Sequence, residues 1–295
     1  MNKSELINSE DVRGKLHFEK ISSITDAVMH EKYLPEDSDK MSLSEKAGSS
    51  EIMKSGIDSL DDMLCSFENG HLYVIGGRPG VGKNALMLQI ARNIASTVNK
   101  PVYILSLDMS GEQIVQRMIS QAARNGDLSE RQRQQISTMP VYICDSTAGI
   151  EEIKRFVKEE INDGILLIDY LQLIGSGIDK VNTAFRLNTT EIARELNCLA
   201  KEKDIPVVVC SQLSGAVEHR PDKRPVLQDL NDKEQYFDVV IFICRNGGFE
   251  AAELILAKNH HGPTGTVNVK FNSENLLFEN IDGIIQMTQG HYFEK

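Results

Sequence analysis

The sequence predicts an α/β fold in which a mainly parallel sheet is covered by helices on both faces. Between residues 70 and 260, short apolar runs of strand length alternate with longer segments that have helical spacing. Several runs, such as residues 165–168 and 207–210, are apolar throughout, as expected for strands buried on both faces. A glycine-rich turn joins the first of these strands to the first long helix. The three observations together favour a doubly covered parallel sheet whose ligands bind at the carboxyl ends of its strands.

The elements follow one another without an internal repeat or a low-complexity tract. The expected strands are short and apolar, and they cover residues 72–75, 102–106, 141–144, 165–169, 207–210 and 239–244. The expected helices have good helix formers and an apolar face, and they cover residues 55–64, 85–95, 111–123, 127–137, 149–160 and 190–203. Two further runs, residues 254–257 and 267–271, flank a Gly-Pro turn and predict a C-terminal β-hairpin.

The first part of the chain differs in composition from the rest. Residues 1–52 are polar and acidic, with linker-like stretches at residues 35–40 and 46–50. Residues 21–34 have the spacing of an amphipathic helix, so this segment is either a docking helix or a disordered tail. We therefore expect an N-terminal segment over residues 1–52, a nucleotide-binding domain over 53–280 and a tail over 281–295.

Composition narrows the class of protein. The 295 residues are 41% hydrophobic and 25% charged, which is ordinary for a globular protein. We expect no membrane span and no signal peptide, because no apolar run is long enough. The five cysteines are scattered without a C-x-x-C pair, which favours reduced thiols and a cytoplasmic location. A net charge of −11 argues against a generally basic nucleic-acid binder, although a local basic loop stays possible.

The glycine-rich turn fits the phosphate-binding pattern G-x-x-x-x-G-K. Its glycines let backbone N–H groups face a polyphosphate, and the following helix start adds a partial positive charge. Lys83 supplies a point charge for the outer phosphates. Asn84 stands where the pattern has the Ser or Thr that binds Mg²⁺ through its hydroxyl. The expected nucleotide-binding residues are Gly77, Arg78, Pro79, Gly80, Val81, Gly82, Lys83, Asn84 and Ala85.

Polar side chains follow three other expected strands at the same edge of the sheet. Asp169 ends an apolar run, where an acid can hold Mg²⁺ through water; otherwise it caps a turn. Asp108 follows residues 102–106, where it either polarises an attacking water or caps the next helix together with Ser110. Gln212 follows the expected strand at residues 207–210, where it either senses the γ-phosphate or is a surface amide.

Two basic segments lie further along the chain. Residues 219–224 form the most basic short run, which is either a nucleic-acid contact or a solvated loop. Lys258 precedes His260 and His261 just before a Gly-Pro turn. Adjacent residues of a strand point to opposite faces, so we expect a nucleotide contact across a subunit boundary rather than a metal ion shared by the two histidines.

Together these segments resemble the C-terminal ATPase domain of DnaB-type replicative helicases, from about Ser55 to Asn280. The segments that carry the resemblance are Arg78-Pro79, residues 106–114, 168–173 and 211–213, Asp222-Lys-Arg-Pro225 and Gly262-Pro-Thr-Gly-Thr266. The resemblance implies a RecA-like P-loop NTPase fold, hexameric rings, ATP and Mg²⁺ between subunits, and single-stranded DNA in the central channel. It also implies that residues 21–34 form a linker helix that docks on the neighbouring subunit. The first 50 residues are too short for the family's primase-recruiting domain.

Several positions depart from the family pattern. The family has Thr or Ser at Asn84, glutamate at Asp108 and an arginine finger at His260, whereas Lys258 is retained. Residues 231–234 replace an Arg-Glu-Ser-Gly type of DNA loop, and Gly215-Ala216 stand where a further arginine is expected. A histidine cannot replace a bidentate arginine, and a trans arginine finger contributes about 10³–10⁵ in rate.

Two functions therefore remain open. One is a helicase-like ATPase in DNA replication with weak hydrolysis, in which Lys83 binds phosphate, and Asn84 and Asp169 hold Mg²⁺. In it Asp108 positions water, Gln212 senses the γ-phosphate, and Lys258 and His260 act on the neighbour's nucleotide. The other is a catalytically degenerate paralogue that acts as a loader, inhibitor or regulatory partner of a true DnaB-type helicase. Another RecA-like family, such as the recombination ATPases, is a weaker option.

Overall fold

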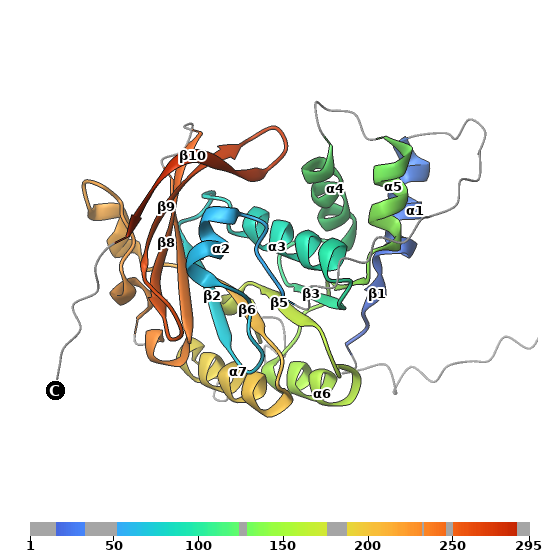
Figure 1. The fold of residues 1–295 in the computed structure, drawn as a ribbon. Helices are drawn as coiled ribbons and strands as arrows, with labels where there is room; N and C mark the ends of the chain where they lie inside the picture. The colour runs from blue at the N-terminus through green and yellow to red at the C-terminus, as the bar shows by residue number, and fades with distance from the viewer. Residues whose placement is uncertain are drawn as a thin grey trace, which may run out of the picture.

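The computed structural model describes residues 16–32, 52–123, 129–175, 188–231, 233–245 and 250–287. The predicted linkers at residues 35–40 and 46–50 lie outside these ranges. The chain forms one ten-stranded sheet with the strand order β1-β4-β3-β5-β6-β2-β7-β8-β9-β10. Helices lie on both of its faces (Figure 1), which confirms the predicted α/β class.

The middle of the sheet is parallel. It consists of β2 (Leu72–Gly77), β3 (Val102–Ser106), β4 (Val141–Cys144), β5 (Ile165–Asp169), β6 (Val207–Gln212) and β7 (Val239–Cys244). Within this group of six, neighbouring strands pair in parallel, so their carboxyl ends lie along one edge. All six were predicted, because strands buried on both faces are apolar throughout.

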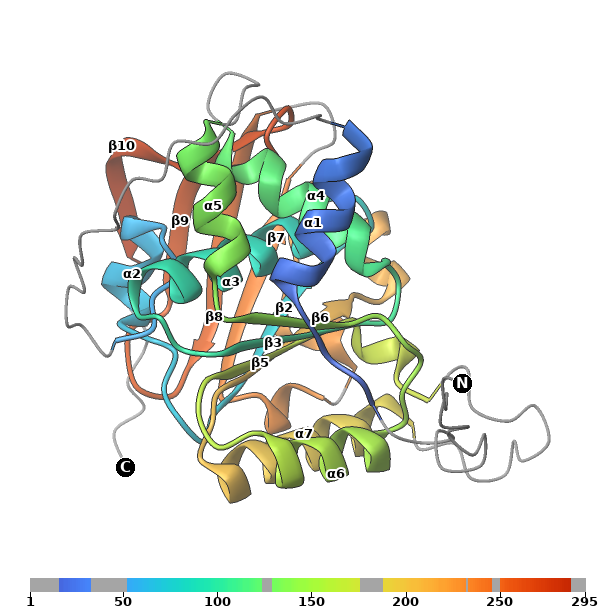
Figure 2. The same ribbon diagram turned by 90° about the vertical axis from the view of Figure 1, so that its right-hand side faces the viewer.

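Alternate residues of each strand pack into two different cores. In β2, Tyr73 and Ile75 face the core that includes α3 (Lys83–Thr97) and α4 (Gly111–Ala122). Leu72 and Val74 face the core that includes α6 (Ile150–Glu160) and α7 (Thr189–Lys203). Figure 2 shows α6 and α7 on one side of the sheet and α1, α4 and α5 on the other. Two cores on one sheet hold the strand ends, and therefore the residues that follow them, in fixed positions.

The remaining helices cover the first core. These are α1 (Ile21–Lys32), α2 (Asp58–Leu64) and α5 (Glu130–Thr138). Ile21, Ile24 and Val28 are buried hydrophobic residues of α1, as the predicted amphipathic spacing requires. The helix packs against α4 and α5 of its own chain, and β1 (Glu19–Lys20) leads into it along the edge of β4. In this structure the helix therefore covers its own domain, whereas the family resemblance implies a neighbouring subunit.

The C-terminal part is an antiparallel extension of the sheet. The predicted hairpin is present as β8 (Ala251–Asn259) and β9 (Gly265–Asn272), and both strands are longer than predicted. A third strand, β10 (Leu277–Met287), pairs with β9 and carries the sheet beyond residue 280. Strand β10 was not predicted from the sequence, and its pairing with β9 shifts register between Asn280 and Ile285. A strand interrupted in this way lacks the continuous alternation by which edge strands are recognised.

Candidate nucleotide-binding site

The glycine-rich turn lies between β2 and α3, as the pattern requires. Gly80 and Gly82 have positive φ angles of +74° and +107°, which favour glycine. A Cβ atom on Gly77 would meet Val81 at 2.7 Å, and one on Gly82 would meet the ring of Phe278 at 3.0 Å. The turn is therefore a tight backbone cradle, in which a side chain at Gly77 or Gly82 would meet its neighbours, whereas Gly80 is favoured by its φ angle alone.

Lys83 is folded back over this cradle. Its Nζ atom donates hydrogen bonds to the carbonyl oxygens of Gly77 at 3.1 Å and Arg78 at 3.0 Å. Burial lowers the pKa of the Lys83 ammonium, and the nearby acids Asp169 and Asp108 act in the opposite direction. A buried cation among backbone groups can exchange its carbonyl partners for the phosphate oxygens of a nucleotide.

Two arginines lie at the rim of the turn. Arg78 forms an ion pair with Glu218 at 3.0 Å and donates to the carbonyl oxygen of Arg245 at 3.0 Å. Arg245 donates to the carbonyl oxygen of Gly80 at 2.9 Å, and its guanidinium stacks 4.1 Å from the centre of the Phe271 ring. Arg245 was not singled out in the sequence, because it follows a strand far along the chain and reaches the turn only through the fold.

Asp169 lies at the end of β5, beside Lys83. It is 2% exposed, and its Oδ1 atom has no hydrogen-bond partner. Burial and then the charge of Asp108 raise the pKa of Asp169 to about 6, although Lys83 acts to lower it. A buried carboxylate with an unsatisfied oxygen is costly, and a divalent cation would satisfy it.

Asn84 is the second expected Mg²⁺ ligand, in the first turn of α3. Its Nδ2 atom contacts the Sδ atom of Met109 at 3.4 Å, so the amide is held on the side of the loop that follows β3. An amide oxygen is an acceptable ligand for a hard cation, and an Asn and an Asp together fit an Mg²⁺ ion that keeps most of its water. The residues present therefore fit a nucleotide–Mg²⁺ complex.

Asp108 follows β3, whose Ser106 pairs with Asp169 of β5. The structure assigns the helix cap to Ser110, which accepts a hydrogen bond from the backbone of Gln113 at 3.3 Å. The alternative that Asp108 caps α4 is therefore wrong. Asp108 is exposed at the same edge as Asp169, and its charge acts on that carboxyl group.

Gln212 ends β6, and a residue that the sequence analysis did not single out holds it. Gln172 donates to the carbonyl oxygen of Gln212 at 2.9 Å and accepts from its backbone N–H at 3.2 Å. It also donates to Ser211 Oγ at 3.1 Å. This bridge fixes the end of β6 against the segment after β5, which includes the η1 turn (Leu171–Leu173). Gln172 lies inside the Asp-Tyr-Leu-Gln segment, which was the available signal.

Lys258 and His260 lie at the other end of the sheet. The backbone N–H of His260 bonds to Asp238, whose own N–H bonds to Leu72 at the start of β2. The glycine-rich turn at residues 77–82, called the phosphate turn below, begins at the opposite end of β2, roughly 16 Å away at ~3.3 Å per residue. Lys258 donates to the carbonyl oxygen of Glu234 at 2.8 Å, and the imidazole of His260 is 3.4 Å from Asp238. The two residues therefore do not join the phosphate turn of their own chain.

Two arginines of the basic run at residues 219–224 form ion pairs with acidic side chains of the same chain. Arg220 pairs with the buried Asp229 through two hydrogen bonds of 2.8 and 2.5 Å. Arg224 pairs with Glu253 and donates to Thr266 Oγ1 at 2.9 Å. Arg224 thus connects the loop to β8 and β9, and Arg220 connects it to the η4 turn (Leu227–Leu230).

These features define a class: an α/β protein with a glycine-rich turn of the G-x-x-x-x-G-K pattern, a buried strand-end acid and further polar residues along one edge of a parallel sheet. The comparisons with known proteins then give the family. The family described as DnaB-like helicase C terminal domain matches residues 53–280, and the chain belongs to it. The resemblance that the sequence motifs indicated is thereby confirmed.

Relatives and solved structures agree with this assignment. The chain is 38% identical to the replicative DNA helicase DnaC of Bacillus subtilis (strain 168) and 36% identical to the replicative DNA helicase DnaB of Geobacillus stearothermophilus. Each match covers 77% of this chain and 56% of the relative, so the chain spans about half the length of these relatives. A solved DnaB-like replicative helicase superposes with a TM-score of 0.67 at 31% identity, covering 78% of this chain and 62% of that chain. The RadB recombinase, with 15% identity and a TM-score of 0.56 over 78% of this chain and 100% of that chain, shares the RecA-like fold alone.

No helix in the part of the chain that the structure describes has both the length and the apolar character needed to cross a membrane.

Proposed function

We propose that this chain is a cytoplasmic, ATP-binding, helicase-like subunit that acts on single-stranded DNA in DNA replication and hydrolyses ATP weakly. Lys83 and the backbone of residues 77–85 bind the phosphates. Asn84 and Asp169 hold Mg²⁺, and Asp108 positions the attacking water. Gln212, held by Gln172, senses the γ-phosphate at the end of β6.

The observation that carries the proposal is the burial of Lys83 and Asp169 close to one another. Both side chains are buried at the carboxyl edge of the sheet, and Asp169 Oδ1 has no hydrogen-bond partner. Burial disfavours both charged forms, so the pKa of Lys83 is lowered and the pKa of Asp169 is raised. An Mg²⁺–polyphosphate complex would supply anionic oxygens to the lysine and a cation to the carboxylate, so it matches both needs.

The position of Lys258 and His260 supports assembly into a ring. Because they lie at the opposite end of β2 from the phosphate turn, they can act only on the nucleotide of another copy. A head-to-tail arrangement that closes as a hexamer would bring one copy's Lys258 to its neighbour's nucleotide. Lys258 supplies a positive charge there, and His260 stands at the position of the family's arginine finger.

Weak hydrolysis follows from three positions. Asn84 offers an amide in place of a hydroxyl, and Asp108 is one methylene shorter than the family's glutamate. His260 lacks the planar fork of an arginine, and burial followed by the charge of Lys258 lowers its pKa, which favours the neutral ring. A neutral imidazole stabilises the transferring phosphoryl group less than a permanent cation does.

The test is phosphate release from ATP and Mg²⁺, with and without single-stranded DNA, by the wild type and by Lys83→Ala. We expect slow release that DNA stimulates and that the substitution abolishes. The matched control is Lys201→Ala, which changes an exposed lysine of α7 and should leave release unchanged. Turnover equal to that of an ordinary ring helicase would contradict the weak-hydrolysis proposal. Phosphate release that persists in Lys83→Ala would contradict the assignment of the nucleotide site to the turn that carries Lys83.

A second candidate function is a loader, inhibitor or regulatory partner of a true DnaB-type helicase. The departures at Asn84, Asp108 and His260 favour it, since they fall on catalytic positions while the fold stays intact. In this case the chain binds nucleotide, releases no phosphate, and copurifies with a full-length DnaB-type helicase in a nucleotide-dependent manner. Failure to associate in the apo, ADP-bound and ATP-bound states would exclude it.

A further inference from the structure

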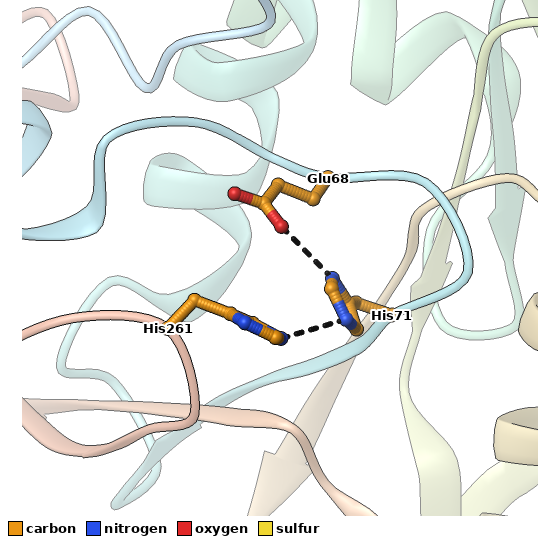
Figure 3. Close-up of side chains that lie close together, drawn as sticks. All are labelled: Glu68, His71 and His261. Carbon is orange, nitrogen blue, oxygen red and sulfur yellow. Dashed lines mark hydrogen bonds and ion pairs between the residues drawn. The ribbon is translucent and has the colours of Figure 1, made fainter.

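A cluster of metal-binding side chains lies outside the nucleotide site. It consists of Glu68 and His71, in the loop between α2 and β2, and His261, in the turn between β8 and β9 (Figure 3). One potential ligand atom from each of the three lies within 4.8 Å of those of the other two. We propose that these residues form a binding site for a divalent transition-metal ion such as Zn²⁺.

The geometry of the two imidazoles supports the proposal. Their Nε2 atoms are 2.9 Å apart, and their ring centres are 4.4 Å apart. A tetrahedral zinc ion, with Zn–N distances of about 2.0–2.1 Å, separates two ligand nitrogens by roughly 3.3 Å. The rings therefore need to open by only a few tenths of an ångström to admit the ion between them. Without an ion, the contact requires one ring to donate and the other to accept.

Glu68 occupies the place of the carboxylate that orients a metal-bound histidine. Its Oε2 atom lies 3.7 Å from Nδ1 of His71, the ring nitrogen that does not face His261. This Nδ1 atom is buried and has no hydrogen-bond partner. Metal-binding histidines usually donate their second N–H to a carboxylate, which fixes the tautomer and raises the affinity for the metal. Glu68 and His71 together thus favour Nε2 of His71 as a ligand.

The two segments that carry the ligands are held together independently of any ion. Asn259 donates to the carbonyl oxygen of Met63, at the end of α2, at 3.2 Å and to that of Pro263 at 3.3 Å. A Cβ atom on Gly262 would lie 3.1 Å from the same Met63 oxygen, so the turn packs closely on the end of α2. The backbone of His261 also bonds to the Asn259 side chain at 3.2 Å. A preorganised site loses less entropy when it binds an ion.

His260 does not belong to this site. It lies in the same turn, not in a strand as the sequence analysis assumed. Its ring is 6.3 Å from that of His261 at an angle of 80°, and it faces Asp238 instead. The two neighbouring histidines therefore face different partners, and the partner of His261 comes from a different segment. A bound ion would link the α2–β2 loop to the turn that carries His260.

The remaining coordination positions are open to water. Two imidazoles and an orienting carboxylate suit zinc, nickel or copper rather than Mg²⁺, which prefers oxygen ligands. The site is thus distinct in chemistry and position from the Mg²⁺ site that Asn84 and Asp169 would form at the other end of the sheet.

The test is binding of Zn²⁺ to the full chain, purified without a histidine tag and freed of metal by chelation. Competition with a chromophoric chelator gives the affinity and stoichiometry, and Co²⁺ absorption reports imidazole coordination. We expect one ion per chain, with the affinity reduced at least tenfold in His71→Ala and in His261→Ala. Glu68→Gln should reduce it by roughly 10–100-fold, the range for outer carboxylate partners.

Matched controls separate this site from others. His219→Ala changes an exposed histidine in the η3 turn (Gly215–His219) and should bind Zn²⁺ as the wild type does. Lys83→Ala should also bind Zn²⁺ normally, which separates the result from the fate of the nucleotide-site proposal. The proposal would be overturned if the wild type does not bind Zn²⁺. It would also be overturned if the wild type, His261→Ala and Glu68→Gln bind Zn²⁺ with equal affinity. Circular dichroism without metal identifies any variant that is unfolded, and Glu68→Gln, at an exposed position, decides the case if a histidine variant fails to fold.

Discussion

Replacing Asp169 by Asn tests the electrostatic account of the nucleotide site. The carboxyl group has a pKa of about 6 in the folded chain against 3.8 for an ordinary aspartate, because burial and Asp108 disfavour its charge. A raised acid pKa means that the charged form destabilises the folded state. The penalty is absent below the unfolded pKa, grows as pH rises, and is complete above the folded pKa. At 1.36 kcal/mol per pKa unit, the full penalty is about 3 kcal/mol.

Asp169→Asn removes this penalty. The free energy of unfolding of the variant relative to the wild type should therefore rise by roughly 1–2 kcal/mol between pH 5 and pH 8, the part of the penalty that accrues in this window. The comparison across pH cancels any fixed cost of burying an amide. The assay is urea denaturation of both proteins in EDTA at several pH values. Asp163→Asn, at an exposed position just before β5, is the control and should show no such rise. A difference that is independent of pH, or that falls with pH, would refute the reasoning.

Three further substitutions test other parts of the structure. Gly82→Ala, at a φ of +107° beside Phe278, should lower the unfolding free energy by about 1–2 kcal/mol and abolish the thermal shift caused by Mg²⁺ and ATP. Arg220→Ala should cost about 2 kcal/mol in urea denaturation, because the buried Asp229 loses its two hydrogen bonds from the guanidinium, whereas Lys223→Ala should have little effect. His260→Arg should raise phosphate release at least tenfold, because a trans arginine contributes about 10³–10⁵. The expectations would be contradicted by an unchanged thermal shift in Gly82→Ala, an unchanged unfolding free energy in Arg220→Ala, or an unchanged rate of phosphate release in His260→Arg.

The sequence predicted most of the fold because the parallel strands are apolar throughout. Strands such as β5 and β7 lie between two layers of helices, so nearly every side chain is buried and the run is continuous. The two-residue strand β1 and the interrupted strand β10 were missed. Neither has a periodic pattern long enough to be recognised, and both form only because a partner strand is present.

The candidate site was predictable in part. Residues directly after parallel strands must lie along one edge, which is why Lys83, Asp108, Asp169 and Gln212 could be grouped from the sequence alone. Contacts between distant segments carried no such signal. Arg245 reaches the phosphate turn through the pairing of β7 with β2.

The histidine cluster shows the same limit. His71 and His261 are 190 residues apart in the chain and meet only because β8 returns along β7, which itself pairs with β2. From the sequence, a shared ion was considered only for His261 and its neighbour His260, and His260 faces Asp238 in the structure. Distance along the chain was a poor guide to which side chains share a site.

The measurement that tests the central claim most directly is binding of a fluorescent ATP analogue to the wild type and to Lys83→Ala, with Mg²⁺ and with EDTA. We predict that the wild type binds the analogue, that Mg²⁺ strengthens binding through Asp169, and that Lys83→Ala does not bind it. The substitution removes the one side-chain ammonium that lies against the carbonyl groups of the phosphate turn in the described structure. Binding of equal strength in the wild type and Lys83→Ala would contradict the account, because the nucleotide would then have to lie elsewhere on the chain.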